Sequence, residues 1–246
     1  MGLQSGLFRG LVVAGLVLGL VGPAQAILMD RGSFTYTDSL ANTGSVNLIY
    51  DPDLDITWVS DANLAQTSGF DGDGRMTWSA ANAWAAGLTI GGMSGWRLPT
   101  TTQPDASCDS QFDGGTFGNQ GFGTGCTGSE MGHLFYNELG GNAGESVLNQ
   151  TGDTDQEKAN LALFSNVQAY FYWSGTEFAP NTSSAWDFHF GLGNQGAVNK
   201  FNDSFAWAVR SGDVSAPPQV PEPSTLLLMG SGVMGLLGWR QWQRRG

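Results

Sequence analysis

Basic residues, cysteine and histidine are scarce in this chain of 246 residues. It has 10 lysine and arginine residues against 22 aspartate and glutamate residues, with two cysteines and two histidines. Nucleic-acid binding needs clustered basic side chains, and those present here are scattered, so most nucleic-acid roles are excluded. Because the only histidines are His133 and His189 and no Cys–His cluster has ligand spacing, a zinc site is not expected.

Enzyme signatures are also lacking. The sequence has no G-x-S-x-G nucleophile elbow and no G-x-x-x-x-G-K-[ST] phosphate loop. His133 lies beside Leu134 and Phe135 and is expected to pack in the interior. No catalytic residue can be assigned, so the sequence predicts a protein that is not an enzyme.

The N-terminus has the pattern of an export signal. Arg9 precedes an apolar run over residues 11–21, and an A-x-A site follows at Ala24 and Ala26. The run is short for a transmembrane helix and is followed by Pro23, so an N-terminal anchor is the weaker interpretation. Residues 1–26 are therefore predicted to be a signal peptide that signal peptidase removes after Ala26.

The C-terminus carries a second signal in three parts. A proline-bracketed motif precedes an apolar segment over residues 225–239 and an arginine-rich end. The motif consists of Val220, Pro221, Glu222, Pro223, Ser224 and Thr225. Proline keeps this peptide extended, and the arginines after a short span would hold the C-terminus on the cytoplasmic side.

This arrangement resembles the PEP-CTERM sorting signal, with a plain tail anchor as the alternative. The resemblance implies an exosortase as the processing partner, a transient inner-membrane anchor, and a Gram-negative host that makes exopolysaccharide. The processed protein would then lie in the cell envelope, on the cell surface or in the extracellular matrix.

Between the two signals lies a body expected to form one domain over residues 27–214, with a linker over 215–219. Without the terminal segments the chain has 6 basic and 21 acidic residues, a net charge of −15. Such acidity favours solubility and suits divalent cations or neutral glycans as partners. The 37 glycines, with many Asn, Ser and Thr residues, indicate long loops.

Both cysteines, Cys108 and Cys126, fall in this exported body. A disulfide is the usual state of such a pair outside the cytoplasm. Closing a loop of this length is worth about 3 kcal/mol in the chain-entropy model. A catalytic or metal-binding thiol is the alternative, but no basic group nearby would lower its pKa.

Residue patterns predict strands, turns and one helix in the body. Thr77 is expected to cap a helix over 78–86 that ends at Gly87. Its inner face is expected to hold Ala80, Ala81, Trp84 and Leu88. The predicted strands cover 34–50 as a hairpin turning at 42–44, and 56–59, 96–98, 169–173, 186–190 and 201–210. Residues 142–160 are predicted to be a loop with a solvated acidic cluster, and Arg97 is expected to pair with a carboxylate.

Several of these segments resemble the Lcl C-terminal domain family of bacterial envelope proteins. The matching segments are T-W-S-A-A-N-A-W-A-A-G-L over 77–88, G-W-R-L-P-T over 95–100, Y-W-S-G-T over 172–176, and A-V-R over 208–210. The resemblance implies a C-type-lectin-like α+β fold with short strands, two helices and long loops. A glycine-rich insertion over 101–128 departs from the family, and a helix is expected to resume over 129–139.

Four residues resemble the calcium-holding segments of sugar-binding C-type lectins: Glu177, Asn181, Asn202 and Asp203. Carboxylate and amide oxygens suit calcium and also accept hydrogen bonds from sugar hydroxyls. The motif is incomplete, and Asn and Asp also favour plain turns, which is the preferred interpretation. Calcium is the one cofactor suggested, and Trp173 and Trp186 are candidates for stacking on a sugar unless they are buried.

The main functional expectation is an exported surface protein that binds polysaccharide or another surface ligand. A structural surface protein without a specific ligand is one alternative. An enzyme similar to formylglycine-generating enzymes is a weaker one, because that chemistry needs reactive cysteines.

Overall fold

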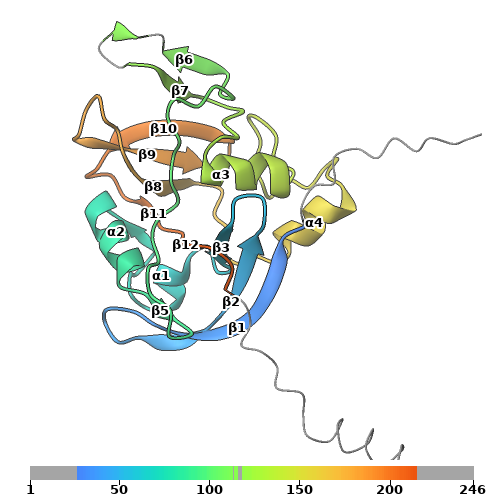
Figure 1. Ribbon diagram of the computed structural model, residues 1–246, viewed down its shortest axis with the longest axis vertical. Coiled ribbons are helices and arrows are strands. Elements are labelled where there is room, and N and C mark those ends of the chain that lie inside the picture. The colour runs from blue at the N-terminus through green and yellow to red at the C-terminus, as the bar shows by residue number, and fades with distance from the viewer. Residues whose placement is uncertain (1–26, 113, 116–117, 215–246) are drawn as a thin grey trace, which may run out of the picture.

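A computed structural model describes residues 27–214 except 113 and 116–117. The expected signal peptide with its cleavage site at Ala24 and Ala26, the linker, the Pro-Glu-Pro motif and the expected membrane segment lie outside the described residues. In the part that is described, no helix has both the length and the apolar character needed to cross a membrane. This part is an α+β fold with two five-stranded sheets and short helices (Figure 1).

The first sheet is built on the predicted hairpin. Its strands, in spatial order, are β12 (Val209–Ser211), β3 (Ile56–Val59), β2 (Thr43–Asp51), β1 (Met29–Thr37) and β5 (Thr89–Ile90). The turn covers residues 38–42 instead of 42–44, because the buried Asp38 carboxylate organises it. Its Oδ1 accepts hydrogen bonds from the backbone N–H groups of Leu40 and Asn42, each at 2.9 Å.

The second sheet combines two segments of the chain. Its strands, in spatial order, are β10 (Asn194–Asn199), β9 (Ser184–His189), β8 (Phe171–Glu177), β11 (Ser204–Phe205) and β4 (Arg75–Met76). The single strand predicted over 201–210 is wrong. The chain leaves this sheet after Phe205 and joins the first sheet at Val209, with the buried Trp207 between them. Strand β10 was not predicted, since its Asn-Gln-Gly start lacks apolar alternation.

The helices are more numerous than the two expected. They are α1 (Leu64–Thr67), α2 (Trp78–Ala86), α3 (Glu130–His133), the π-helix η2 (Leu134–Glu138) that continues α3, and α4 (Asp155–Leu161). Helix α2 has the predicted bounds, although the Thr77 side chain makes no capping hydrogen bond. Ala80 is exposed, so its assignment to the inner face is wrong; Ala85 is buried there instead.

Helix α4 falls inside the predicted loop 142–160. Thr154 and Glu157 form a capping box, in which each side chain bonds to the backbone N–H of the other residue. The acidic residues expected as a solvated cluster therefore lie at a helix start, where negative charge suits the helix dipole. The T-x-x-E spacing was the signal for this helix.

Tryptophan fills much of the interior. Trp58, Trp84, Trp96, Trp173, Trp186 and Trp207 are all at most 2% exposed. Trp58 and Trp207 meet edge to face with ring centroids 5.2 Å apart. The buried side chains form two clusters, one around Trp84 and Trp173 and one around Trp58 and Trp207. Trp173 and Trp186 are therefore core residues and are not available for stacking on a sugar.

The predicted disulfide between Cys108 and Cys126 is confirmed. It closes the insertion that carries the hairpin of β6 (Ser110–Phe112) and β7 (Gln120–Phe122). Figure 1 shows this hairpin beyond the β8–β9–β10 sheet. The insertion packs tightly on α3, because a Cβ atom at Gly132 would lie only 1.7 Å from the Cys126 carbonyl oxygen.

The expected partner of Arg97 is Glu130. The guanidinium donates two hydrogen bonds of 2.7 Å to the Glu130 carboxylate, which also accepts the Thr100 N–H at 2.7 Å. Two-pronged pairs of this kind combine charge with fixed geometry. The pair therefore ties the segment before the insertion to the helix after it.

We predict that Glu130→Gln lowers the free energy of unfolding by about 2 kcal/mol, because a charged, two-pronged bond in a partly buried place is lost. Urea denaturation followed by tryptophan fluorescence measures the change. Asp73→Asn is the matched control, since it breaks the exposed pair of Asp73 with Arg75. The control should lose much less stability, and equal losses would contradict the assigned role of Glu130.

Candidate functional site

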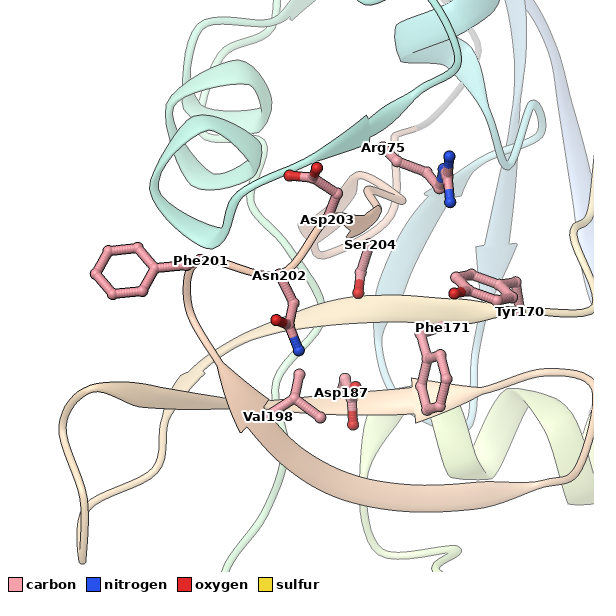
Figure 2. A pocket seen from close by; sticks show the side chains of 9 residues that line it. All are labelled: Arg75, Tyr170, Phe171, Asp187, Val198, Phe201, Asn202, Asp203 and Ser204. Atoms are coloured by element: carbon pink, nitrogen blue, oxygen red, sulfur yellow. The ribbon is translucent and has the colours of Figure 1, made fainter.

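A polar cavity of about 450 Å³ lies beside the second sheet. Strands β4, β8, β9, β10 and β11 and the loop from β10 to β11 supply its walls. The lining residues are Arg75, Tyr170, Phe171, Asp187, Val198, Phe201, Asn202, Asp203 and Ser204 (Figure 2). We call this cavity the Asp187 pocket.

Asp187 is the residue that sets the chemistry of this pocket. In β9 it alternates with Trp186 and Phe188, which are buried on the other face of the strand. Its side chain is almost fully buried, yet neither carboxylate oxygen has a hydrogen-bond partner. Burial raises the pKa of this carboxyl from 3.8 to about 7. The pocket thus holds an acid that changes charge near neutral pH and has two acceptor oxygens free.

The neighbouring strand leaves room for a group to approach Asp187. Gly196 in β10 lies directly opposite Asp187. A Cβ atom at this glycine would lie 3.2 Å from Asp187 Oδ1, tighter than an ordinary contact. The missing side chain therefore keeps space beside the carboxylate.

One side of the pocket is aromatic and cationic. Tyr170 is 41% exposed, and the Arg75 guanidinium lies 5.9 Å from the centre of its ring. Arg75 is itself paired with Asp73 at 2.8 Å, which fixes its position. Figure 2 shows Arg75 and Tyr170 on the same side, while Phe201 points away from the other labelled side chains. Tyr170 is therefore the aromatic surface that a ligand in the pocket could contact.

The structure divides the four expected calcium residues. Asn202 and Asp203 line the Asp187 pocket, on the loop from β10 to β11. Glu177, at the end of β8, pairs with Lys200, and Asn181 accepts a hydrogen bond from the Ser183 N–H at 3.2 Å in the following turn. Neither Glu177 nor Asn181 lines the pocket, so the pocket brings together only half of the expected set.

Sequence reasoning missed Arg75, Tyr170 and Asp187 as pocket residues. Asp187 falls in the predicted strand 186–190, but the strand pattern does not show that the face it shares is covered. The available signal was a single carboxylate between two large aromatic residues in a predicted strand, Trp186 and Phe188. Arg75 and Tyr170 are distant in sequence, so only the fold brings them together.

The disulfide bears on the enzyme alternative. Both cysteines are bonded to each other, and the described residues contain no free thiol. A reaction of the formylglycine-generating type would need a reactive thiol. The main feature that suggested this alternative is thereby removed.

We predict that Asp187→Asn stabilises the fold at high pH. The pKa of Asp187 is higher in the folded state, at about 7, than in the unfolded state, at 3.8. Ionisation of Asp187 therefore lowers the stability of the wild type as pH rises from about 4 to 7, and this loss is absent below about pH 4. The variant should gain about 2–4 kcal/mol of unfolding free energy at pH 8 and little at pH 4.

Urea denaturation across this pH range measures the effect. Asp203→Asn is the matched control, because Asp203 is an exposed carboxylate in the same pocket. It should leave the pH profile almost unchanged. A profile for Asp187→Asn that runs parallel to the wild type would show that Asp187 does not titrate in this range.

Residues 219–245 match the PEP-CTERM protein-sorting motif. This confirms the sorting signal predicted at the C-terminus. Comparison with curated proteins and with solved structures finds no match. The resemblance of the body to the Lcl C-terminal domain therefore stays a prediction. The sorting motif indicates an exported, exosortase-processed surface protein of a Gram-negative bacterial envelope.

Proposed function

We propose that this sorted surface protein is a non-enzymatic binding module with a C-type-lectin-like fold. Its ligand is a sugar residue of an extracellular polysaccharide, held in the Asp187 pocket. The observation that carries the proposal is the buried Asp187 carboxylate with two free oxygens in an accessible polar cavity.

The groups around Asp187 suit a neutral sugar. Its two oxygens can accept hydrogen bonds from neighbouring hydroxyl groups, while the Asn202 amide and the Ser204 hydroxyl can both donate and accept. The exposed Tyr170 ring offers a flat surface for the apolar face of the sugar. An acidic body would repel acidic polymers but not uncharged ones. We therefore favour a neutral polysaccharide.

Calcium is the alternative way to hold the same ligand. Asn202 and Asp203 would then supply oxygen ligands, and the sugar hydroxyls would complete the coordination. The two modes differ in one measurable respect, since only the second requires a free divalent ion. Polysaccharide binding that persists in excess chelator supports direct contacts with the pocket, whereas loss of polysaccharide binding in chelator supports the calcium mode.

We predict saturable binding of the host exopolysaccharide by the full-length chain in a mild detergent, measured by isothermal titration calorimetry. Tyr170→Ala should weaken affinity about tenfold through loss of stacking, and Asp187→Asn should weaken it through loss of an acceptor. Leu40→Ala is the control, because Leu40 is 62% exposed at the turn between β1 and β2. Absence of binding with and without calcium would favour a structural surface protein.

We also predict that replacing Pro221, Glu222 and Pro223 together with alanine prevents exosortase processing in the native host. The extended peptide that the enzyme would recognise is lost, so the unprocessed chain should accumulate in the membrane fraction. Immunoblotting and mass spectrometry measure this. The control replaces Pro217 and Pro218 in the preceding linker. Normal processing of the triple variant would contradict the role of the motif.

A further inference from the structure

A second set of buried ionisable side chains lies apart from the Asp187 pocket, where the turn after β2 meets α3 and η2. Asp51 ends β2, His133 ends α3 and Glu138 ends η2. One oxygen or nitrogen atom from each of the three lies within 4.8 Å of the others. Asp51 precedes His133 by 82 positions in the sequence, and His133 precedes Glu138 by five. Sequence spacing therefore does not indicate the cluster.

Each of the three residues has one buried atom without a hydrogen-bond partner. These atoms are Asp51 Oδ2, His133 Nε2 and Glu138 Oε1. The Asp51 and Glu138 residues are both 0% exposed. Unpartnered carboxylate oxygens in such a place are costly, because burial removes the water that would solvate them. The three atoms lie within 4.8 Å of one another. A protonated His133 would pair with Glu138 Oε1 at 3.5 Å, but a neutral imidazole would leave all three atoms free to bind a further group.

The other polar atoms of these residues are occupied, which fixes their orientation. Asp51 Oδ1 accepts hydrogen bonds from the N–H groups of Asp53 and Leu54 at 3.0 and 3.2 Å. Glu138 Oε2 accepts one from the Asn160 amide at 3.2 Å. His133 Nδ1 lies 2.9 Å from the Asn137 amide. The amide nitrogen faces Nδ1 in this arrangement. Metal binding would require a half-turn of that amide, so that its oxygen accepts from Nδ1–H and Nε2 keeps its lone pair.

The π-helical turn brings His133 and Glu138 together. Residues five apart on an α-helix point about 140° away from each other. In the wider turn of η2, His133 Nε2 and Glu138 Oε1 are 3.5 Å apart. Two ligands bound at about 2.1 Å to one tetrahedral ion are separated by about 3.4 Å, which agrees with this distance. Such π-turns are frequent at functional sites.

We propose that Asp51, His133 and Glu138 bind a divalent transition-metal ion, with zinc as the best fit. One nitrogen and two carboxylate oxygens form a small mixed set, which suits zinc better than the six to eight oxygens that calcium takes. Two carboxylates and a neutral imidazole carry a charge of −2, which the ion neutralises. The partly exposed Asp53, whose Oδ2 lies 4.0 Å from His133 Nε2, marks the solvent side and can supply a fourth ligand.

A bound ion would join the first sheet to the helix after the insertion, so it is expected to stabilise the fold. The test uses the untagged full-length chain in a mild detergent, stripped with chelator and then titrated with ZnCl2. Zinc should bind at one equivalent per chain and raise the melting temperature by about 5 °C in excess metal. Calorimetry and tryptophan fluorescence measure the two effects.

Glu138→Gln and His133→Gln should each lose both the zinc binding and the shift in melting temperature. Without metal, Glu138→Gln should melt no lower than the wild type, because it removes a buried charge. The matched controls are Asp187→Asn, which changes another buried carboxylate, and His189→Gln, which changes the other histidine; both should keep the full zinc response.

Two results would overturn the proposal. One is a folded wild-type chain that does not bind zinc and whose melting temperature does not change at millimolar zinc. The other is a zinc response that survives in His133→Gln. This position is the more tolerant of substitution, because the His133 side chain is 13% exposed and that of Glu138 is fully buried. The controls keep this test separate from sugar binding, since Asp187→Asn changes the Asp187 pocket and the baseline stability but leaves all three proposed zinc ligands in place.

Discussion

The side chain of Trp207 lies where the two sheets meet. Its indole N–H donates to the Val59 carbonyl oxygen at 2.6 Å, and its ring contacts Trp58 and Phe164, each with ring centroids 5.2 Å apart. The residues on either side belong to different sheets, since Phe205 pairs with β8 and Val209 pairs with β3. Burying the large apolar surface of Trp207 at this crossing stabilises the fold. Because the same short segment pairs with both sheets, it holds the two sheets together.

This crossing segment also connects the architecture to the function. The residues just before it, Asn202, Asp203 and Ser204, form one wall of the Asp187 pocket. Soon after the crossing segment, Asp213 forms an ion pair of 2.6 Å with Arg31 in β1. The last part of the body therefore builds the pocket wall, closes both sheets and returns to the first strand. The sorting motif begins at residue 219, a few positions beyond the last described residue.

The sequence predicted those elements whose local pattern is strong. Apolar alternation located the first hairpin. Thr77 and Gly87 bounded α2 correctly because the alanine-rich segment between them favours a helix, although the Thr77 side chain makes no capping hydrogen bond. Long-range closure was not predictable: nothing in residues 201–210 shows that the chain changes sheets. Both sites depend on the same kind of information. The Asp187 pocket also requires Arg75 and Tyr170, and the second site requires both Asp51 and His133. These residues come from remote segments that only tertiary packing brings together.

The carboxylates of Asp187, Asp51 and Glu138 are the most costly of the buried polar groups that lack a hydrogen-bond partner in the described part of the chain, because a carboxylate can carry a charge. Each has at least one oxygen without a partner, in a protein that already has a net charge of −12. Charge repulsion and lost solvation both disfavour folding around such groups. Local conflicts of this kind concentrate at functional sites, where a ligand supplies the missing interaction. A sugar hydroxyl would supply it for Asp187 and a divalent ion for the other two, so ligand binding would stabilise this acidic fold at both places.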